Sequence, residues 1–113
     1  MVYLMKYMLL STSLLLVAAP VLAAADAYTL TIENHAFVPK EIKVPAGQKL
    51  RLLVVNKDPT PAEFESKPLA REKIIAGKSS ATILIGPLKP GRYPFVEEYH
   101  EKDAAAQGVI VAE

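Results

Sequence analysis

Apolar and polar residues alternate along most of the chain after residue 25. Tyr28, Leu30 and Ile32 alternate with two threonines and Glu33, which is the period-two pattern of a strand with one buried face. The segment Lys49–Asn56 (KLRLLVVN) is apolar on both faces in its second half, as expected for a central strand of a two-sheet core. The pattern predicts further strands at residues 42–44, 63–66, 73–75, 79–85, 92–96 and 108–112.

Proline and glycine separate these predicted strands. The stretch NKDPTP after residue 55 cannot continue a sheet ladder, because proline lacks the amide donor. Pro68–Glu72 (PLARE) is predicted to form one helical turn. In LKPGRY, a Pro-Gly turn precedes Tyr93, which resembles the tyrosine corner of Greek-key sandwiches, where the phenol bonds to the backbone. About seven short strands and no long helix therefore predict an all-β, Greek-key β-sandwich.

The first 25 residues have the organisation of a secretory signal peptide. Lys6 is their one charged side chain, an apolar stretch covers Tyr7–Val17, and small residues (AAPVLAAADA) follow. Cleavage is expected after Ala25, with Ala23 as the alternative site. A membrane anchor is the competing interpretation. We expect residues 1–25 to be removed and 26–113 to form one exported, periplasmic domain.

Charge and cysteine content exclude several function classes. The chain has 13 basic and 12 acidic residues, a net charge of +1 and no long run of either sign, so nucleic acid and anionic membranes are not expected partners. It has no cysteine, which excludes disulfides, thiolate nucleophiles and iron–sulfur clusters. Its five glycines are scattered, so there is no phosphate-binding loop. Any metal must use nitrogen and oxygen ligands, and we do not expect an enzyme.

Several motifs in order resemble the cupredoxin family. The segment Phe37–Asn56 contains F-x-P-x-x-I-x-V-x-A-G, and it is followed by GRYPFVEEYH and then GVIV. The chain is most similar to a cysteine-free periplasmic subgroup, related to the cupredoxin domains of bacterial iron-uptake systems, through EFES, REK, IGPLKPGRYPF and EYH. This resemblance implies a cupredoxin-like sandwich for nearly the whole mature chain.

The sequence departs from blue-copper cupredoxins at the ligands. The resemblance places the usual cysteine at Glu97 and the second histidine at His100, which is retained. The methionine position falls on Ala106 and the first histidine position on Ala62. A type 1 copper site depends on the cysteine thiolate, so blue-copper electron transfer is not expected.

The predicted fold gathers nitrogen and oxygen donors at one end of the sandwich. Carboxylate and imidazole favour Cu(II) or iron over Cu(I). The subgroup resemblance implies Glu63, Glu98 and His100 as ligands, with His35 as a fourth, and Glu97 is the rival of Glu98. Glu63 alternates away from Phe64, as Glu65 does, so an outward orientation and a role as loop anchor is the alternative for it. The candidate metal ligands are His35, Glu63, Glu97, Glu98 and His100.

Two functional hypotheses follow from these observations. In the first, an exported metal-binding protein captures Cu(II) or iron and delivers it beside an inner-membrane iron permease, as the subgroup resemblance implies. In the second, the metal site is vestigial and the sandwich is an interaction or assembly module. A homodimer whose two carboxylate-rich ends share a metal remains open under the first hypothesis.

Overall fold

The computed structural model describes residues 13–16 and 26–113. Residues 13–16 have no regular secondary structure, and the rest of the predicted signal peptide lies outside the described residues. Among the helices of the described part, none is long and apolar enough to cross a bilayer. The signal peptide and its cleavage site therefore stay predictions.

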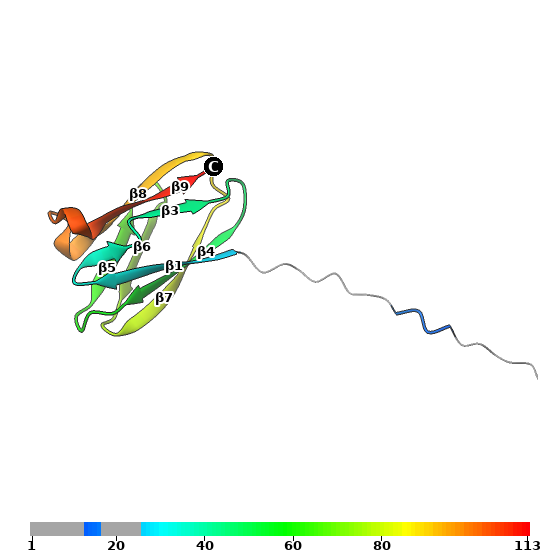
Figure 1. Cartoon of the computed structure of the whole chain (residues 1–113), viewed down its shortest axis with the longest axis horizontal. Helices are drawn as coiled ribbons and strands as arrows, with labels where there is room; N and C mark the ends of the chain where they lie inside the picture. Colours follow the sequence, from blue (N-terminus) through cyan, green and yellow to red (C-terminus); the bar gives the residue numbers. More distant parts are fainter. Residues whose placement is uncertain (1–12, 17–25) are drawn as a thin grey trace, which may run out of the picture.

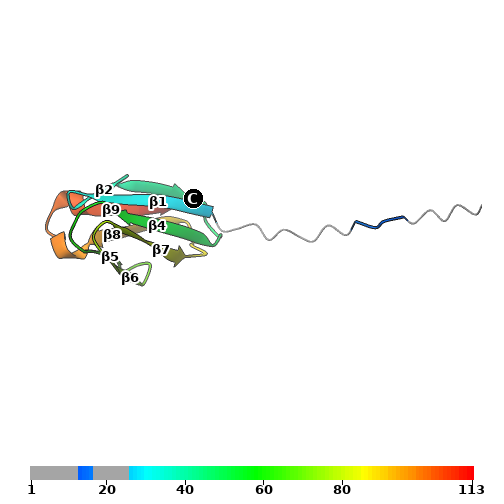
Figure 2. The ribbon, with the colours of Figure 1, turned by 90° about the horizontal axis from the view of Figure 1, so that it is seen from below.

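The described residues form nine strands in two sheets that pack face to face (Figures 1 and 2). The first sheet has the order β2-β1-β4-β7, and the second has the order β3-β9-β8-β5-β6. The strands are β1 (Asp26–Glu33), β2 (Ala36–Val38), β3 (Glu41–Val44), β4 (Leu50–Asn56), β5 (Ala62–Ser66), β6 (Arg71–Ile75), β7 (Ser79–Ile85), β8 (Gly91–Glu97) and β9 (Gln107–Ala112).

The connections confirm the predicted Greek-key β-sandwich. The chain changes sheet after β2, β3, β4, β6 and β7, whereas β1–β2, β5–β6 and β8–β9 each stay within one sheet. β1 runs parallel to β4, with Ile32 opposite Asn56, and β3 runs parallel to β9. The parallel pairing of β1 with β4 places the turn after β1 beside the loop after β4. Both segments contribute residues to the candidate site.

The sequence analysis missed one strand and assigned one segment wrongly. β2 was not predicted, and the helical turn predicted at Pro68–Glu72 is wrong, because β6 begins at Arg71. Arg71 and Glu72 pair with Ser66 and Glu65 of β5, and these cross-strand bonds outweigh the local helical propensity of PLARE. The only helices in the described chain are two three-residue 3₁₀ turns, η1 (Glu98–His100) and η2 (Ala104–Ala106). The sequence analysis predicted no long helix, in agreement with this.

Three phenylalanines form the centre of the core between the sheets. The ring of Phe95 lies 4.8 Å from that of Phe37 and 5.2 Å from that of Phe64, centroid to centroid. Gly108 on β9 makes room for this cluster, because a Cβ there would lie 2.4 Å from the Cζ atom of Phe95. The aliphatic residues packed around the rings include Leu30, Ile32, Val54, Ile75 and Ile110.

The predicted tyrosine corner is present. The Tyr93 hydroxyl donates a hydrogen bond of 2.7 Å to the carbonyl oxygen of Lys89, which fixes the turn that leads into β8. Burial then alternates along β8, with Phe95 and Glu97 both pointing inward. The same strand therefore supplies a core phenylalanine and, at its end, a candidate metal ligand.

Candidate metal centre

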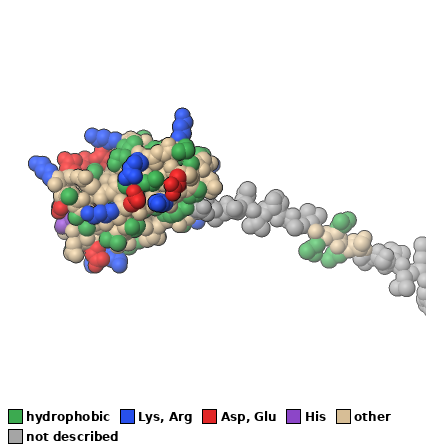
Figure 3. Space-filling model, turned by 45° about the horizontal axis from the view of Figure 1, so that its top comes forward, with side chains coloured by type: hydrophobic (Ala, Val, Ile, Leu, Met, Phe, Trp, Pro, Cys, Tyr) green, Lys and Arg blue, Asp and Glu red, His purple; other side chains and the backbone are tan. Residues whose placement is uncertain are grey.

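All five predicted ligands lie at the same end of the sandwich. His35 is in the β1–β2 turn, Glu63 is in β5, Glu97 ends β8, and Glu98 and His100 belong to η1. Acidic side chains and a histidine are visible together at one end of the domain in Figure 3. The structure divides these residues into two groups with donor atoms within 4.8 Å of one another. One group is His35, Glu97 and His100, and the other is Glu63, Glu72 and Glu98.

The alternation of side chains across the five-stranded sheet explains this division. Glu97 lies opposite Phe64 in the β5–β8 pair, so both side chains point to the inner face. Glu63 and Glu65 precede and follow Phe64, and they project to the outer face. Glu72 pairs with Glu65 across β5–β6 and shares that outer face. The histidine-containing group and the carboxylate group are thus on opposite sides of one sheet.

Glu97 is a fully buried carboxylate, with 0% of its surface exposed. Its Oε1 atom accepts hydrogen bonds from the backbone amides of Glu63, at 2.9 Å, and Tyr99, at 3.2 Å. Its Oε2 atom contacts Nδ1 of His100. A buried carboxylate is costly unless it is hydrogen-bonded, and here two amides and an imidazole satisfy it.

The two histidine rings stack on each other above this carboxylate. Their centroids are 3.6 Å apart and their planes are inclined by 18°. The side chain of His35 is 41% exposed and that of His100 is 36% exposed, so both rings reach solvent. They line a depression together with Asn34, Asp58 and the Pro59–Pro61 segment. An ion could therefore reach the imidazoles without opening the core.

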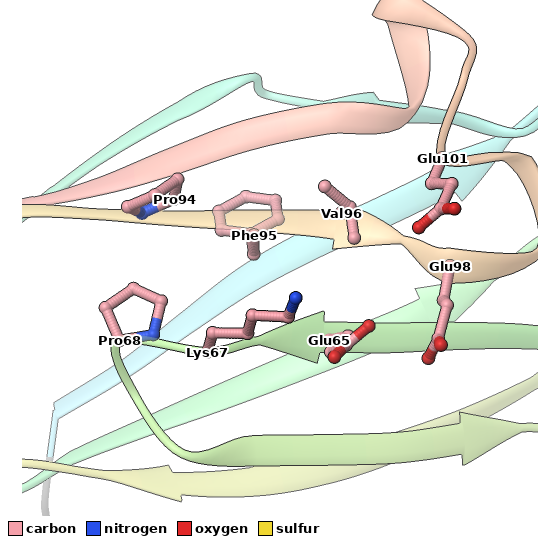
Figure 4. Close-up of a pocket in the computed structure, with 8 residues that line it drawn as sticks. All are labelled: Glu65, Lys67, Pro68, Pro94, Phe95, Val96, Glu98 and Glu101. Carbon is pink, nitrogen blue, oxygen red and sulfur yellow. The ribbon is translucent and has the colours of Figure 1, made fainter.

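The carboxylate group on the outer face is crowded. Glu63 is 8% exposed, and its pKa is raised from 4.5 to about 7, first because it shares a hydrogen bond with Glu72 and then because of burial and the charge of Glu98. The pKa of Glu98 is also raised, chiefly by a hydrogen bond with Glu65. Its Oε2 atom is buried and has no hydrogen-bond partner among the residues that the structure describes. Figure 4 shows Glu65 and Glu98 side by side next to Lys67. The close approach of like-charged carboxylates thus contributes to the raised pKa values of Glu63 and Glu98.

The raised pKa of Glu63 predicts that the stability of the domain depends on pH. The folded domain holds a proton on Glu63 between pH 4.5 and about 7, where the unfolded chain has released it, so the free energy of unfolding rises as pH falls through this window. We expect the melting temperature of the metal-free protein to increase from pH 8 to pH 5, and the increase to be smaller in Glu63→Gln. Circular dichroism melts across this range measure the effect, and equal slopes for both proteins would contradict it.

Asp58 is a residue of the site that the sequence analysis missed. It lies in the β4–β5 loop, which was interpreted only as a break between strands. Its carboxylate accepts hydrogen bonds from the backbone amides of Asn34, at 2.8 Å, and His35, at 2.9 Å. These bonds lower the pKa of Asp58, the bond from His35 contributing most. Asp58 lies two residues after Asn56, the last residue of a strand that runs parallel to β1, and this position was the signal that could have found it.

The donor set of the first group fits a metal ion of intermediate to hard character. Two imidazoles and one carboxylate suit Cu(II) and iron, whereas Cu(I) prefers sulfur ligands. The carboxylate of Glu97 is held in place by hydrogen bonds from two backbone amides.

Residues 6–112 match the cupredoxin-like domain family. The chain belongs to this family. It is also 44% identical, over 82 residues, to an uncharacterised protein of Rickettsia prowazekii, in a match covering 73% of this chain and 64% of that protein. The chain thus spans less than two thirds of the length of this curated relative.

Solved structures similar to this cupredoxin-like domain include copper proteins. The metal-binding domain of a Cu(I)-exporting P-type ATPase of Streptococcus pneumoniae D39 has a TM-score of 0.67 and 15% identity, over 77% of this chain and 84% of that one. Auracyanin of Roseiflexus castenholzii has a TM-score of 0.65 and 18% identity, over 80% and 99%. Amicyanin of Paracoccus versutus has a TM-score of 0.61 and 18% identity, over 80% and 85%. At these identities the likeness concerns the fold alone.

The positions that the resemblance aligned with the ligands of blue-copper cupredoxins carry few metal donors in this chain. Ala62 and Ala106 are buried and carry no donor atom, and the chain has no cysteine. His35 comes instead from the β1–β2 turn, outside the aligned ligand positions. The donors available near Glu97 are therefore nitrogen and oxygen atoms.

Proposed function

We propose that this cupredoxin-like domain binds Cu(II) or iron through His35, Glu97 and His100. The observation that carries the proposal is the convergence of the chain's only two histidines on one fully buried carboxylate. The two histidines come from the β1–β2 turn and from η1, and their rings stack where both reach solvent. A shared ligand gives a reason for this arrangement.

The arrangement favours binding and delivery over catalysis or electron transfer. Imidazole and carboxylate donors stabilise the higher-charged ions, so an ion held here is not easily cycled to Cu(I). The exposed ring edges of His35 and His100 support exchange of the ion with a partner at the surface. Glu63 and Glu98, which the resemblance implied as ligands, lie in the carboxylate group, and we prefer Glu97 as the carboxylate donor for this reason.

The cellular setting of this proposal rests on the sequence. The predicted signal peptide supports export to the periplasm, and the subgroup resemblance supports supply of the ion to an inner-membrane iron permease. A homodimer that joins two metal-binding ends is compatible with the exposed position of the histidines. The alternative is an interaction module with a vestigial site, in which the carboxylate-rich end docks on a partner.

Titration of the domain with metal tests the proposal. The domain from Asp26 to Glu113 contains every strand and core residue of the described structure, so it is expected to fold alone. Stripped of metal at neutral pH, it should bind one equivalent of Cu(II) or iron by calorimetry, and Cu(II) should give only a weak visible band. His100→Ala should abolish this binding while circular dichroism remains unchanged. Failure of both ions to bind would favour the interaction module.

A further inference from the structure

Asp58 connects the loop after β4 to the turn that carries His35. Its Oδ1 atom accepts a hydrogen bond from the backbone amide of Asn34, and its Oδ2 atom accepts one from the backbone amide of His35. The same Oδ2 atom lies 3.5 Å from Nδ1 of the His35 imidazole. One carboxylate thus contacts both the backbone and the ring of a candidate ligand.

The turn that Asp58 holds has a histidine where glycine is usual. Asn34 and His35 form the two-residue loop of the β1–β2 hairpin, since Glu33 pairs with Ala36. Both have positive φ angles, 53° for Asn34 and 61° for His35. Glycine is usual at the second of these positions, and a side chain there is disfavoured. The charge-assisted bonds from both amides to Asp58 compensate for this cost.

Asp58 is itself firmly held. Its amide donates to Oδ1 of Asn56 at 3.1 Å, and Nδ2 of Asn56 donates to the carbonyl oxygens of Thr60, at 2.8 Å, and Ile75, at 3.2 Å. Gly77 touches the same loop, because a Cβ there would lie only 2.1 Å from the carbonyl oxygen of Pro59. The carboxylate therefore has little freedom to move away from His35.

We propose that Asp58 is the positioning residue of His35 in the metal site. This inference rests on the proposed function and identifies a residue that acts on the ion through another side chain. The anionic carboxylate near Nδ1 holds the ring proton on that nitrogen, so the lone pair of Nε2 is the donor that His35 offers. It also fixes the ring plane against His100. Carboxylates thus contact Nδ1 of both histidines, Asp58 at His35 and Glu97 at His100.

The variant Asp58→Asn tests the inference, with Glu41→Gln as its control. Glu41→Gln also removes one negative charge, but the Glu41 carboxylate lies 3.5 Å from Nη1 of Arg92. In the described part of the chain, Glu41 belongs to neither group of candidate metal ligands. Asp58→Asn should raise the dissociation constant for Cu(II) by roughly 10- to 100-fold, the usual effect of losing a carboxylate that orients a ligand. Glu41→Gln should leave the constant unchanged.

The ring tautomer separates positioning from a merely structural role. Nitrogen-15 NMR of the metal-free domain above pH 8 should show the His35 proton on Nδ1 in the parent and in Glu41→Gln, and a mixture of tautomers in Asp58→Asn. A His35 proton on Nε2 in the parent overturns the inference, even if the variant does not fold. Unchanged tautomer and affinity in a folded Asp58→Asn overturn it as well.

The two proposals fail in different ways. If the parent domain binds neither Cu(II) nor iron, the proposed function fails, and the tautomer measurement on metal-free protein still decides whether Asp58 orients His35. If the parent binds metal and Asp58→Asn binds it equally well, the function stands and the role of Asp58 is rejected.

Discussion

Phe95→Ala is expected to lower the free energy of unfolding by about 3–5 kcal/mol, the usual cost of truncating a buried phenylalanine. The ring is 1% exposed and contacts those of Phe37 and Phe64, so removal leaves a cavity at the centre of the core. A domain of this size has a stability of about 5–15 kcal/mol, so the loss is a large part of the total. Urea unfolding followed by circular dichroism measures it.

Leu84→Ala is the matched control for this prediction. Leu84 is also apolar and also lies in a strand, but it is 63% exposed, and its truncation should change stability by less than about 0.5 kcal/mol. Equal effects of the two substitutions would mean that the phenylalanine cluster is not the core. Because Phe95 and Glu97 are two residues apart on β8, the Phe95 variant should also weaken metal binding.

The strands could largely be predicted from sequence because their periodicity is local information. The alternation around Leu30 and the two-faced apolar run before Asn56 both correspond to strands of the structure. The hairpin at Asn34 and His35 lacks the Asn-Gly or Asp-Gly signal of such turns, and β2 has only three residues. The hairpin forms because Asp58, which is distant in sequence, accepts hydrogen bonds from both residues of the turn.

The candidate site was predictable in its location but not in its grouping. The resemblance placed donors at one end of the sandwich, and the structure brings them there. Glu72 could not be found, since the sequence placed it in a helical turn rather than opposite Glu65. The choice between Glu97 and Glu98 did have a signal, because Glu97 continues the inward alternation of Phe95. Side-chain packing, which periodicity does not encode, determined the rest.

Glu97→Gln should raise the dissociation constant for Cu(II) by roughly 100-fold or more, at or beyond the upper end of the range for residues that only orient a ligand. The side-chain oxygen of glutamine can still accept the hydrogen bonds that Glu97 accepts from the backbone amides of Glu63 and Tyr99. The fold should therefore persist, while the site loses its one carboxylate donor. Calorimetric titration of the folded variant measures the change.

Glu98→Gln is the partner experiment, because it makes the same chemical change one residue later. Glu98 belongs to the carboxylate group on the outer face of the sheet, so its loss should change the dissociation constant by less than about threefold, well below the effect of losing an orienting residue. The reverse result, with Glu98→Gln abolishing binding and Glu97→Gln tolerated, would transfer the ion to Glu63, Glu72 and Glu98. An all-carboxylate site favours harder ions than a site with two imidazoles, so that result would also shift the preferred cargo from copper to iron.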